Sequence, residues 1–443
     1  MERATAEAPA TAWRAERGWL TPTRAAITLW FVLVAACTGW GAGLILSGHG
    51  LSLNAPPLLG YVDPRIGPLL LIPIAVAIGA VRAAPPLAVR LGWRGLLAAS
   101  MAGVVVWAIA LALVDGTAGI SAPLTSDHEY LTIVGQISSP GDFLFHFTER
   151  ISGYATHIRG HPPGMALIVW GLAQVGLGGP LPASVLIVIV AASMAPATLI
   201  AVRETAGEEI ARRAAPFIVI APAAIWVAVS ADALFAGVGA WAVALIVLAI
   251  HRRGRWWDLA ALAGGLLFGI ALFLSYGLIL LALVPVAAAA SARRVRPLAI
   301  ATVGALAIVL AFLAAGFWWL DGLEATRQEY LFASAAENRP YGFFAFNNIA
   351  ALGLAVGPAT FVAIARLRDR RFLPLVAGGL AAVALADLSG MSKGEVERIW
   401  LPFMPWLLAA GACLWKPPGS VRGWLGAQAG CAIAIAALVR TPW

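Results

Sequence analysis

The chain has 443 residues, of which 61% are hydrophobic and 12% charged, and a formal net charge of +8. A mean hydropathy of +0.86 excludes an ordinary soluble protein, and the continuous Leu, Ala, Val and Ile runs exclude a strand-built barrel. The basic residues stand in short clusters between apolar runs, which is typical of topology signals and headgroup contacts rather than of a nucleic-acid surface. The sequence therefore predicts an all-α, polytopic membrane protein.

Fourteen apolar segments follow one another along the chain. They cover residues 27–46, 68–81, 95–114, 164–179, 183–202, 214–229, 233–250, 259–274, 276–290, 297–316, 346–365, 372–388, 400–415 and 423–439. Residues 1–26 are predicted to be a cytoplasmic tail, and residues 27–443 a single transmembrane domain. The three cysteines lie in or beside apolar segments and are predicted to be inert packing residues.

The segment at residues 164–179 decides the topology. If it crosses the membrane and the N-terminus is cytoplasmic, 12 of the 30 Lys and Arg lie inside; if it returns to the same side, 22 of 30 do. Only the second arrangement obeys the positive-inside rule. We therefore predict about thirteen crossings plus one re-entrant or interfacial helix, which begins after Pro162-Pro163.

This topology places five segments on the extracytoplasmic face. They are residues 47–67, 115–163, 230–232, 317–345 and 389–399. Of the 22 acidic residues, 13 fall on this face. Acids do not set orientation, so their asymmetry indicates that the working surface faces outward.

The loop at residues 115–163 is the longest stretch too polar for a bilayer and holds four of the six histidines. Its acidic pair, Asp127 and Glu129, has the residue type of a general base or of a group that positions a hydroxyl nucleophile. Two residues apart on a helix, they would point in different directions. A solvated acid or a helix N-cap remains the alternative, because Thr125-Ser126-Asp127 precedes a helix-like run.

Two further clusters suit phosphate or sugar recognition. His161, with Arg159 before it, stands at the Pro-Pro helix start, where a plain interfacial helix entrance is the alternative. Lys393 and Arg398 precede the apolar segment at 400–415, at the level of outer headgroups. There an aromatic-belt anchor with Trp400 and Trp406 is the alternative.

The remaining polar groups are weaker candidates. Asp232 lies in a turn, where a helix-tip hydrogen bond competes with a catalytic role. Residues 316–344 mix aromatic and planar polar side chains and form a candidate acceptor loop, with Arg327, Asn338, Arg339 and Tyr341. The histidines lack a typical zinc motif, so we predict no metal and no cofactor, although one carboxylate pair is also compatible with a divalent cation.

The pattern resembles the GT-C superfamily of polytopic glycosyltransferases, which includes protein O-mannosyltransferases, aminoarabinose transferases and actinobacterial arabinosyl- and mannosyltransferases. The similar motifs are Ser126-Asp127-His128-Glu129-Tyr130 in the first large outward loop, Gly160-His161-Pro162-Pro163-Gly164 about thirty residues later, and the run from Arg398 to Pro405.

The resemblance implies a polyprenyl-phosphate sugar donor, transfer on the extracytoplasmic side and an inverting direct displacement. It assigns Asp127 as the base or acceptor-orienting carboxylate, His161 as a donor-phosphate or acceptor contact, and Arg398 as a phosphate ligand. His128, inside the acidic motif, is a further candidate substrate contact. The acceptor would be a cell-envelope glycan, lipid or protein, and the location the plasma (inner) membrane of a bacterium, which the Ala, Gly and Arg bias also favours.

Two other functions compete with a glycosyltransferase. A transporter or flippase of a lipid-linked sugar would share the spans and the basic clusters, but it should show intramembrane charges and two related halves with broken helices. This chain keeps nearly all its charges in loops, which favours the enzyme. The other alternative is a non-catalytic assembly subunit.

Overall fold

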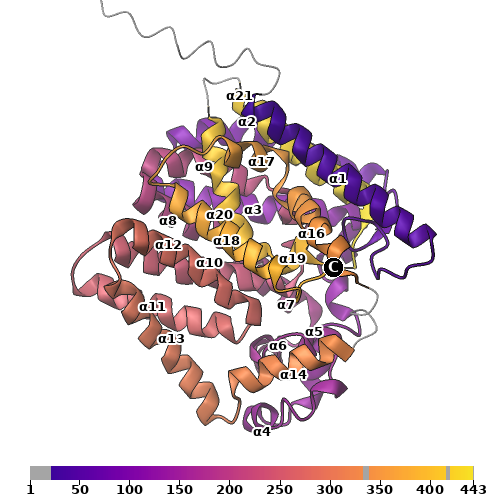
Figure 1. The fold of residues 1–443 in the computed structure, drawn as a ribbon, viewed down its shortest axis with the longest axis vertical. Helices are drawn as coiled ribbons and strands as arrows, with labels where there is room; N and C mark the ends of the chain where they lie inside the picture. The colour runs from indigo at the N-terminus through magenta and orange to yellow at the C-terminus, as the bar shows by residue number, and fades with distance from the viewer. Residues whose placement is uncertain (1–20, 333–338, 416–419, 443) are drawn as a thin grey trace, which may run out of the picture.

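The computed structural model describes residues 21–332, 339–415 and 420–442. In these ranges the structure is almost entirely helical, and the only strands are β1 (Tyr61–Val62) and β2 (Val439–Arg440), which pair antiparallel. The prediction of an all-α fold is confirmed. Figure 1 shows the helices gathered in one large bundle with a smaller group below it.

The α-helices are α1 (Pro22–Leu46), α2 (Leu71–Arg90), α3 (Trp93–Ala112), α4 (Pro140–Phe145), α5 (Thr156–Arg159), α6 (Gly164–Gln174), α7 (Pro180–Ala192), α8 (Met194–Ala206), α9 (Glu208–Val219), α10 (Ala231–His251), α11 (Arg255–Leu272), α12 (Leu283–Ala292), α13 (Arg296–Ala314), α14 (Trp319–Phe332), α16 (Tyr341–Val356), α17 (Pro358–Ala365), α18 (Leu373–Leu388), α19 (Val396–Ile399), α20 (Met404–Leu408) and α21 (Ser420–Leu438). The 3-10 helices are η2 (Pro68–Leu70), η3 (Leu113–Ile120), η4 (Ala122–Thr125), η5 (Tyr130–Gln136), η6 (Ile151–Gly153), η7 (Pro222–Trp226), η8 (Tyr276–Ala282), η9 (Leu401–Phe403) and η10 (Ala409–Leu414).

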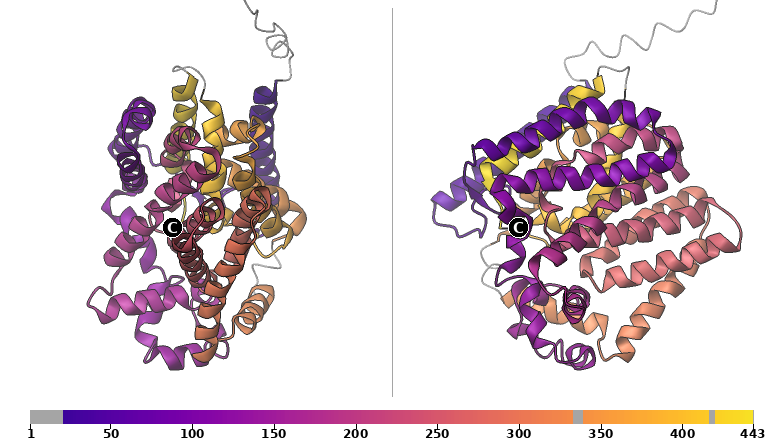
Figure 2. Two further views of the ribbon diagram at one scale, coloured as in Figure 1. Left: turned by 90° about the vertical axis from the view of Figure 1, so that its left-hand side faces the viewer. Right: turned by 180° about the vertical axis from the view of Figure 1, so that it is seen from behind.

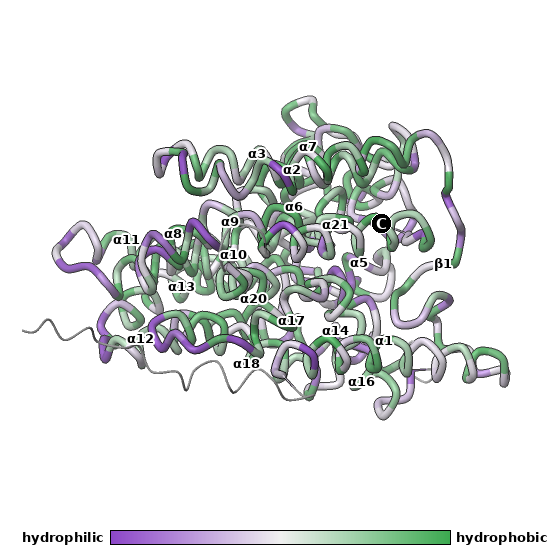
Figure 3. The backbone as a smooth tube through the Cα atoms, turned by 90° about the horizontal axis from the view of Figure 1, so that it is seen from above, coloured by the Kyte–Doolittle hydropathy of each residue, from purple (hydrophilic) through white to green (hydrophobic). Residues whose placement is uncertain are grey.

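The chain is a polytopic helical membrane protein. By length and composition, eight of the described helical segments can cross a bilayer, or nine if the bent pair α16 and α17 forms one span. Figure 3 shows hydrophobic residues along most of these helices and hydrophilic ones mainly where the chain turns. On the outermost helix, α1, Leu29, Phe31 and Val32 are exposed, as expected of side chains that face lipid.

Several of the predicted crossings differ from straight, full-length helices. The segments at 164–179, 276–290 and 372–388 are short apolar helices of 10–17 residues. The segment at 346–365 bends by 101° between α16 and α17, at Gly357, whose φ is +77°. The segments at 214–229 and 400–415 are divided into short helical pieces that contain prolines, and proline removes a donor from the helix ladder.

The structure agrees with the prediction that residues 164–179 do not cross the membrane. Here α6 has only 11 residues and spans about 16 Å, which is too short for a bilayer. Arg398 contacts both His157 and Asp232, so the segments 115–163, 230–232 and 389–399 lie together. A full crossing at 164–179 would have placed residues 230–232 on the opposite face from the loop at 115–163.

The central helix of the bundle is α10. Its 21 residues are almost entirely apolar, and 78% of its membrane-spanning window is buried, compared with 11% for α1. It packs on α7, α8, α11 and α12. The first turn of α10, which begins at Ala231, is thereby held in the middle of the protein under the polar loops.

A smaller group of helices lies below the bundle in Figure 1 and consists of α4, α5, α6 and α14. The two views of Figure 2 agree that the magenta loop segments and the end of the orange α13–α14 region come together there. The sequence suggested a loop at 316–344, but residues 319–332 form α14. This helix is tied to the large loop by the Thr326 hydroxyl, which donates to the Arg159 carbonyl at 2.9 Å.

Close backbone packing joins α11 to α13. A β-carbon on Gly265 would lie 2.0 Å from the Ala301 carbonyl oxygen, and one on Gly304 would lie 2.5 Å from the Leu262 carbonyl oxygen. Small residues let two helices approach in this way where no hydrophobic effect drives them together.

We expect Gly265→Val to destabilise the protein by about 1–3 kcal/mol, because the helices must separate to admit the side chain. Thermal unfolding in detergent measures the loss. The matched control is Gly430→Val in α21, where a β-carbon meets no neighbour among the described residues within 4 Å. An equal loss in both variants would contradict the packing argument, since it would reflect helix propensity alone.

Candidate functional site

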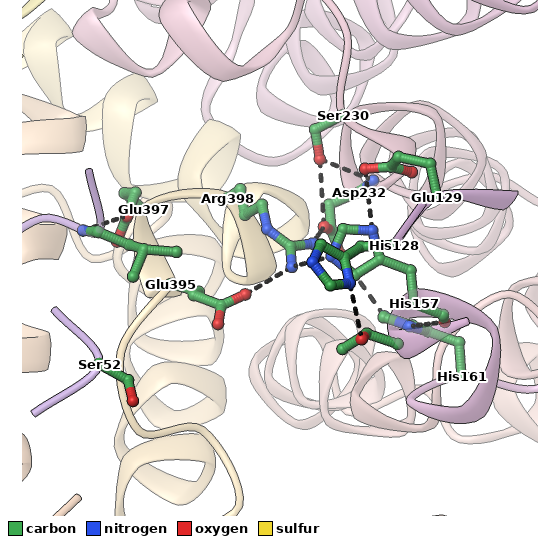
Figure 4. Close-up of polar contacts among 12 residues, drawn as sticks. Ser52, His128, Glu129, His157, His161, Ser230, Asp232, Glu395, Glu397 and Arg398 are labelled. Atoms are coloured by element: carbon green, nitrogen blue, oxygen red, sulfur yellow. Dashed lines mark hydrogen bonds and ion pairs between the residues drawn. The ribbon is translucent and has the colours of Figure 1, made fainter. Parts of the chain in front are cut away.

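Buried charges converge where the loop at 115–163, the start of α10 and the short helix α19 meet (Figure 4). We call Glu129, His157, His161, Asp232, Glu395 and Arg398 the polar cluster. Its members come from three of the predicted extracytoplasmic segments, and a fourth, residues 317–345, contributes Arg339 at its edge. The cluster therefore lies at one end of the spans, beneath the polar loops.

Arg398 is the centre of the polar cluster and is only 5% exposed. Its guanidinium donates to Asp232 at 2.5 Å and to Glu395 at 2.6 Å, and lies 3.0 Å from Nε2 of His157. Burial disfavours the charged guanidinium, but Asp232 and Glu395 outweigh it and raise the pKa of Arg398 above its ordinary value. The side chain thus stays charged and holds three segments of the chain together.

Asp232 is placed by the first turn of α10. The Ser230 side chain caps this helix by accepting from the Asp232 N–H at 3.2 Å, and its hydroxyl donates to the Asp232 carboxylate at 3.1 Å. An acid in the first turn is also favoured by the helix dipole. These contacts fix the carboxylate opposite Arg398.

Glu129 and His157 form the second buried pair. Nδ1 of His157 lies 2.9 Å from a carboxylate oxygen of Glu129, and both side chains are almost entirely buried. The other carboxylate oxygen of Glu129 is buried and has no hydrogen-bond partner among the described residues. An uncommitted carboxylate oxygen beside an oriented imidazole is suited to accept a proton from a hydroxyl group.

His161 closes the polar cluster on the side of Asp232. Its Nδ1 lies 2.9 Å from the His157 carbonyl oxygen, so Nδ1 carries the hydrogen, and Nε2 is 3.9 Å from the Asp232 carboxylate. Burial lowers the pKa of His161, against the opposing effect of Asp232. We therefore expect a neutral imidazole whose Nε2 can accept a hydrogen bond.

Glu395 links the polar cluster to Arg339. Its carboxylate accepts from Arg398 and, at 3.3 Å, from Arg339, which also donates to the backbone carbonyls of Lys393 and Ser52. Burial opposes ionisation of Glu395, but the two guanidiniums outweigh it and lower its pKa to about 2. The carboxylates of Glu395 and Asp232 are thus both paired with guanidiniums.

Glu397 sits beside the cluster and anchors the loop at 47–67. It is fully buried, and one carboxylate oxygen accepts from the Leu59 N–H at 3.0 Å. Burial raises the pKa of Glu397 to about 7, although backbone N–H groups oppose the shift. The proton on this carboxyl group therefore stabilises the folded state.

Stability is expected to fall as the pH rises through 7, because the folded pKa of Glu397 lies above the value of about 4.3 of an exposed Glu. The stabilisation is fully present below the pKa of the unfolded state and is lost as the pH rises above the pKa of the folded state. Glu397→Gln mimics the protonated acid, so the variant should melt at a higher temperature than the wild type at about pH 8 and at a similar temperature at about pH 5. Glu324→Gln, at an exposed position, is the control. If the Tm difference between Glu397→Gln and the wild type were the same at both pH values, Glu397 would not be the titrating group.

The predicted acidic pair is divided by the structure. Glu129 is 5% exposed and belongs to the polar cluster, whereas Asp127 is exposed and its side chain makes no hydrogen bond or ion pair with a described residue. The two residues do point in different directions, as predicted, although on an irregular turn before η5 and not on a helix. His128 is exposed too and lies 3.1 Å from the Thr156 hydroxyl.

The predicted phosphate ligands are also separated. Arg159 is half-buried and lies 3.6 Å from Glu329 of α14, and Lys393 is half-buried with no hydrogen bond or ion pair from its ammonium group to a described residue. The two terminal nitrogens of Arg398 are engaged by Asp232, Glu395 and His157. Arg398 is therefore placed to position other groups, and Lys393 and Arg159 are the more accessible cations.

The candidate acceptor loop is brought only partly to the site. Arg339 is 9% exposed and joins Glu395, as described. Arg327 is exposed and pairs with Glu324 at 3.3 Å, and Tyr341 is 43% exposed at the start of α16. Asn338 lies outside the described residues.

Sequence reasoning left out His157 and Glu395 and gave Asp232 a minor role. Asp232 and Arg398 are 166 positions apart, so no local pattern joins them. The available signals were the four-residue spacing of His157 and His161 and the placement of 230–232 and 389–399 on one face. In the ranges that the structure describes, no group of three or more His, Cys, Asp or Glu side chains has an arrangement that could hold a metal ion.

No protein-family profile matches the chain, and no curated protein matches it. Among solved structures, the chain is similar to the crystal structure of ArnT from Cupriavidus metallidurans in the apo state, with a TM-score of 0.40 and 18% sequence identity. The match covers 62% of this chain and 54% of that chain, so it spans about half the length of that protein.

Proposed function

We propose that the chain is a membrane glycosyltransferase that moves a sugar from a polyprenyl-phosphate donor to a cell-envelope glycan, lipid or protein. The observation that carries this proposal is the polar cluster itself: buried and half-buried carboxylates and histidines around Arg398, at one end of the membrane spans and beneath the polar loops. Carboxylates and imidazoles bind sugar hydroxyl groups, and a lipid-linked donor is confined to the same membrane. The similarity of the sequence motifs to the GT-C superfamily points to the same chemistry.

The proposed reaction is an inverting displacement. The acceptor hydroxyl transfers its proton to a carboxylate while its oxygen attacks the anomeric carbon of the donor. The bond between that carbon and the phosphate oxygen breaks, and the polyprenyl phosphate leaves with the electron pair. Glu129 is the carboxylate that the cluster holds ready for the proton, and exposed Asp127 would orient the acceptor at the rim.

The leaving phosphate needs positive charge, and the guanidiniums of Arg398 and Arg339 are already paired with carboxylates. Lys393 and Arg159, both half-buried, are the proposed phosphate contacts. His161 offers a hydrogen-bond acceptor to the donor sugar. Arg398 acts through Asp232, Glu395 and His157 and is a positioning residue in this scheme.

The proposed setting is the plasma (inner) membrane of a bacterium, with a cytoplasmic N-terminus and the cluster facing outward. The eight to nine spans and the shared face of the loops support this orientation only together with the positive-inside rule. Membrane lipids and a membrane-embedded donor are the proposed partners.

A transporter of a lipid-linked sugar is the second candidate, and the bend of 101° between α16 and α17 is the feature that fits it. Broken helices at transporter sites end near the bound substrate. The polar cluster lies instead at the start of α10 and on α19, so the candidate site is not formed by the bend between α16 and α17.

The test of the phosphate contacts is donor kinetics in proteoliposomes. We expect Lys393→Gln to raise the KM for polyprenyl-phosphate sugar about tenfold, because one charge-assisted hydrogen bond to phosphate is lost. Arg327→Gln, an exposed cation on α14, should leave KM unchanged. Equal KM values in all three proteins would remove Lys393 from the donor site, and no transfer by the wild type would overturn the proposed function.

A further inference from the structure

A second, basic cavity lies at the C-terminal end of α10, the helix whose first turn positions Asp232. It has a volume of about 430 Å³ and is formed by the loop between α10 and α11 and the loop between α12 and α13. Its lining includes five arginines and one aspartate, namely Arg252, Arg253, Arg293, Arg294, Arg296 and Asp258. In Figure 3 the loop beside α11 is strongly hydrophilic at the edge of the molecule.

Three of these arginines are fixed by protein contacts. Arg252 forms a bidentate pair with Glu204, at 2.6 and 2.8 Å. Arg294 donates to two backbone carbonyls, which ties the second loop to the end of α10, and Arg296 pairs with Asp258 at 2.7 Å. These contacts build the walls of the cavity and hold both loops in place.

The other two arginines, Arg253 and Arg293, are exposed, and their side chains make no hydrogen bond or ion pair with any described residue. Arg293 ends α12 in the left-handed region, with φ of +53°, and its backbone N–H donates to the Ala290 carbonyl. The backbone of this residue is thus held by the turn while its side chain is uncommitted. The cavity therefore offers two guanidiniums within a strongly positive wall.

The position of the cavity indicates where its ligand comes from. The 21 residues of α10 rise about 30 Å, so the cavity is a membrane thickness away from Asp232. Beside it, Trp256 is 68% exposed at the start of α11, and the Arg252 guanidinium stacks over the Trp257 ring at 4.5 Å. Exposed tryptophan beside arginine is typical of the level of lipid headgroups.

We propose that this cavity binds a phosphate group, held by Arg253 and Arg293, and that the phosphate belongs to an anionic lipid headgroup of the cytoplasmic leaflet. Arginine presents a planar fork of donors that matches phosphate oxygens. The positive-inside rule explains why basic residues lie on this face. It does not require that two loops bring five arginines to one cavity and leave the side chains of two of them without a hydrogen-bond or ion-pair partner among the described residues.

The test is lipid binding to the full chain in detergent, counted by native mass spectrometry. The protein is titrated with phosphatidylglycerol, with phosphatidylcholine and with inorganic phosphate. We expect the wild type to bind phosphatidylglycerol more tightly than phosphatidylcholine, and Arg253→Gln/Arg293→Gln to weaken phosphatidylglycerol binding about tenfold. Arg370→Gln/Arg371→Gln removes the same charge from exposed residues of the loop between α17 and α18 and should change little.

Displacement of phosphatidylglycerol by millimolar inorganic phosphate, in the wild type only, would keep the phosphate site but assign it to a soluble phosphate compound. Equal weakening in the two double variants would show that net charge alone attracts the lipid and would overturn the site. Unchanged binding in Arg253→Gln/Arg293→Gln would overturn it as well. The Tm of both double variants, measured in parallel, identifies any loss that comes from misfolding.

Discussion

An Arg398→Gln variant is expected to lose sugar transfer and to unfold well below the wild-type temperature. The substitution leaves buried Asp232 without its cation and leaves Glu395 with Arg339 alone, and breaking a buried pair from one side costs about 3–5 kcal/mol. It also releases His157 and therefore the orientation of Glu129. Thermal unfolding in detergent and transfer in proteoliposomes measure the two losses, with Arg327→Gln on the exposed face of α14 as the control.

A double variant separates the two roles of Arg398. Asp232→Asn removes the carboxylate that Arg398→Gln leaves unpaired. The double variant Asp232→Asn/Arg398→Gln should therefore recover part of the stability lost in Arg398→Gln, while sugar transfer stays absent. Stability losses that simply add in the double variant would contradict the direct ion pair. Recovery of transfer would show that Arg398 has no part in positioning the reacting groups.

A Glu129→Gln variant is expected to reduce transfer about 10²–10⁴-fold with little change in Tm. Glutamine keeps the shape of the side chain and can still accept the hydrogen bond from Nδ1 of His157, but it cannot take up a proton. The fold should therefore remain, while the carboxylate needed for the proton is lost. The kcat, rather than the donor KM, should carry the effect.

Asp127→Asn should be compared with Glu129→Gln, because Asp127 is exposed and lies outside the polar cluster. We expect it to raise the KM for the acceptor and to leave most of kcat. The reverse pattern, with transfer abolished by Asp127→Asn and retained by Glu129→Gln, would exchange the roles of the two carboxylates.

Much of the fold could be predicted from hydropathy and charge. The apolar runs predicted the helices. The count of Lys and Arg on each side predicted that residues 164–179 do not cross, and the contacts of Arg398 with His157 and Asp232 agree with this prediction. Hydropathy could not predict the bend at Gly357 or the pieces of helix around residues 214–229 and 400–415, because these segments stay apolar while proline or a positive φ breaks the ladder.

The candidate site could be predicted only in part. The sequence identified the loop, the acidic pair, His161 and Arg398 from their residue types. It could not choose between Asp127 and Glu129, because two residues so close in sequence differ only in the direction that the turn gives them. Two partners of Arg398, Asp232 and His157, are 166 and 241 positions away, so their pairing depends on how α10, α19 and the large loop pack.

Transfer of a radiolabelled sugar from polyprenyl-phosphate donors to a membrane glycan fraction, in proteoliposomes that contain the wild type or Glu129→Gln at equal levels, tests the proposed enzyme most directly. We expect labelled glycan with the wild type and almost none with Glu129→Gln. No transfer with any donor, together with movement of the donor across the vesicle membrane, would contradict a glycosyltransferase and favour a transporter.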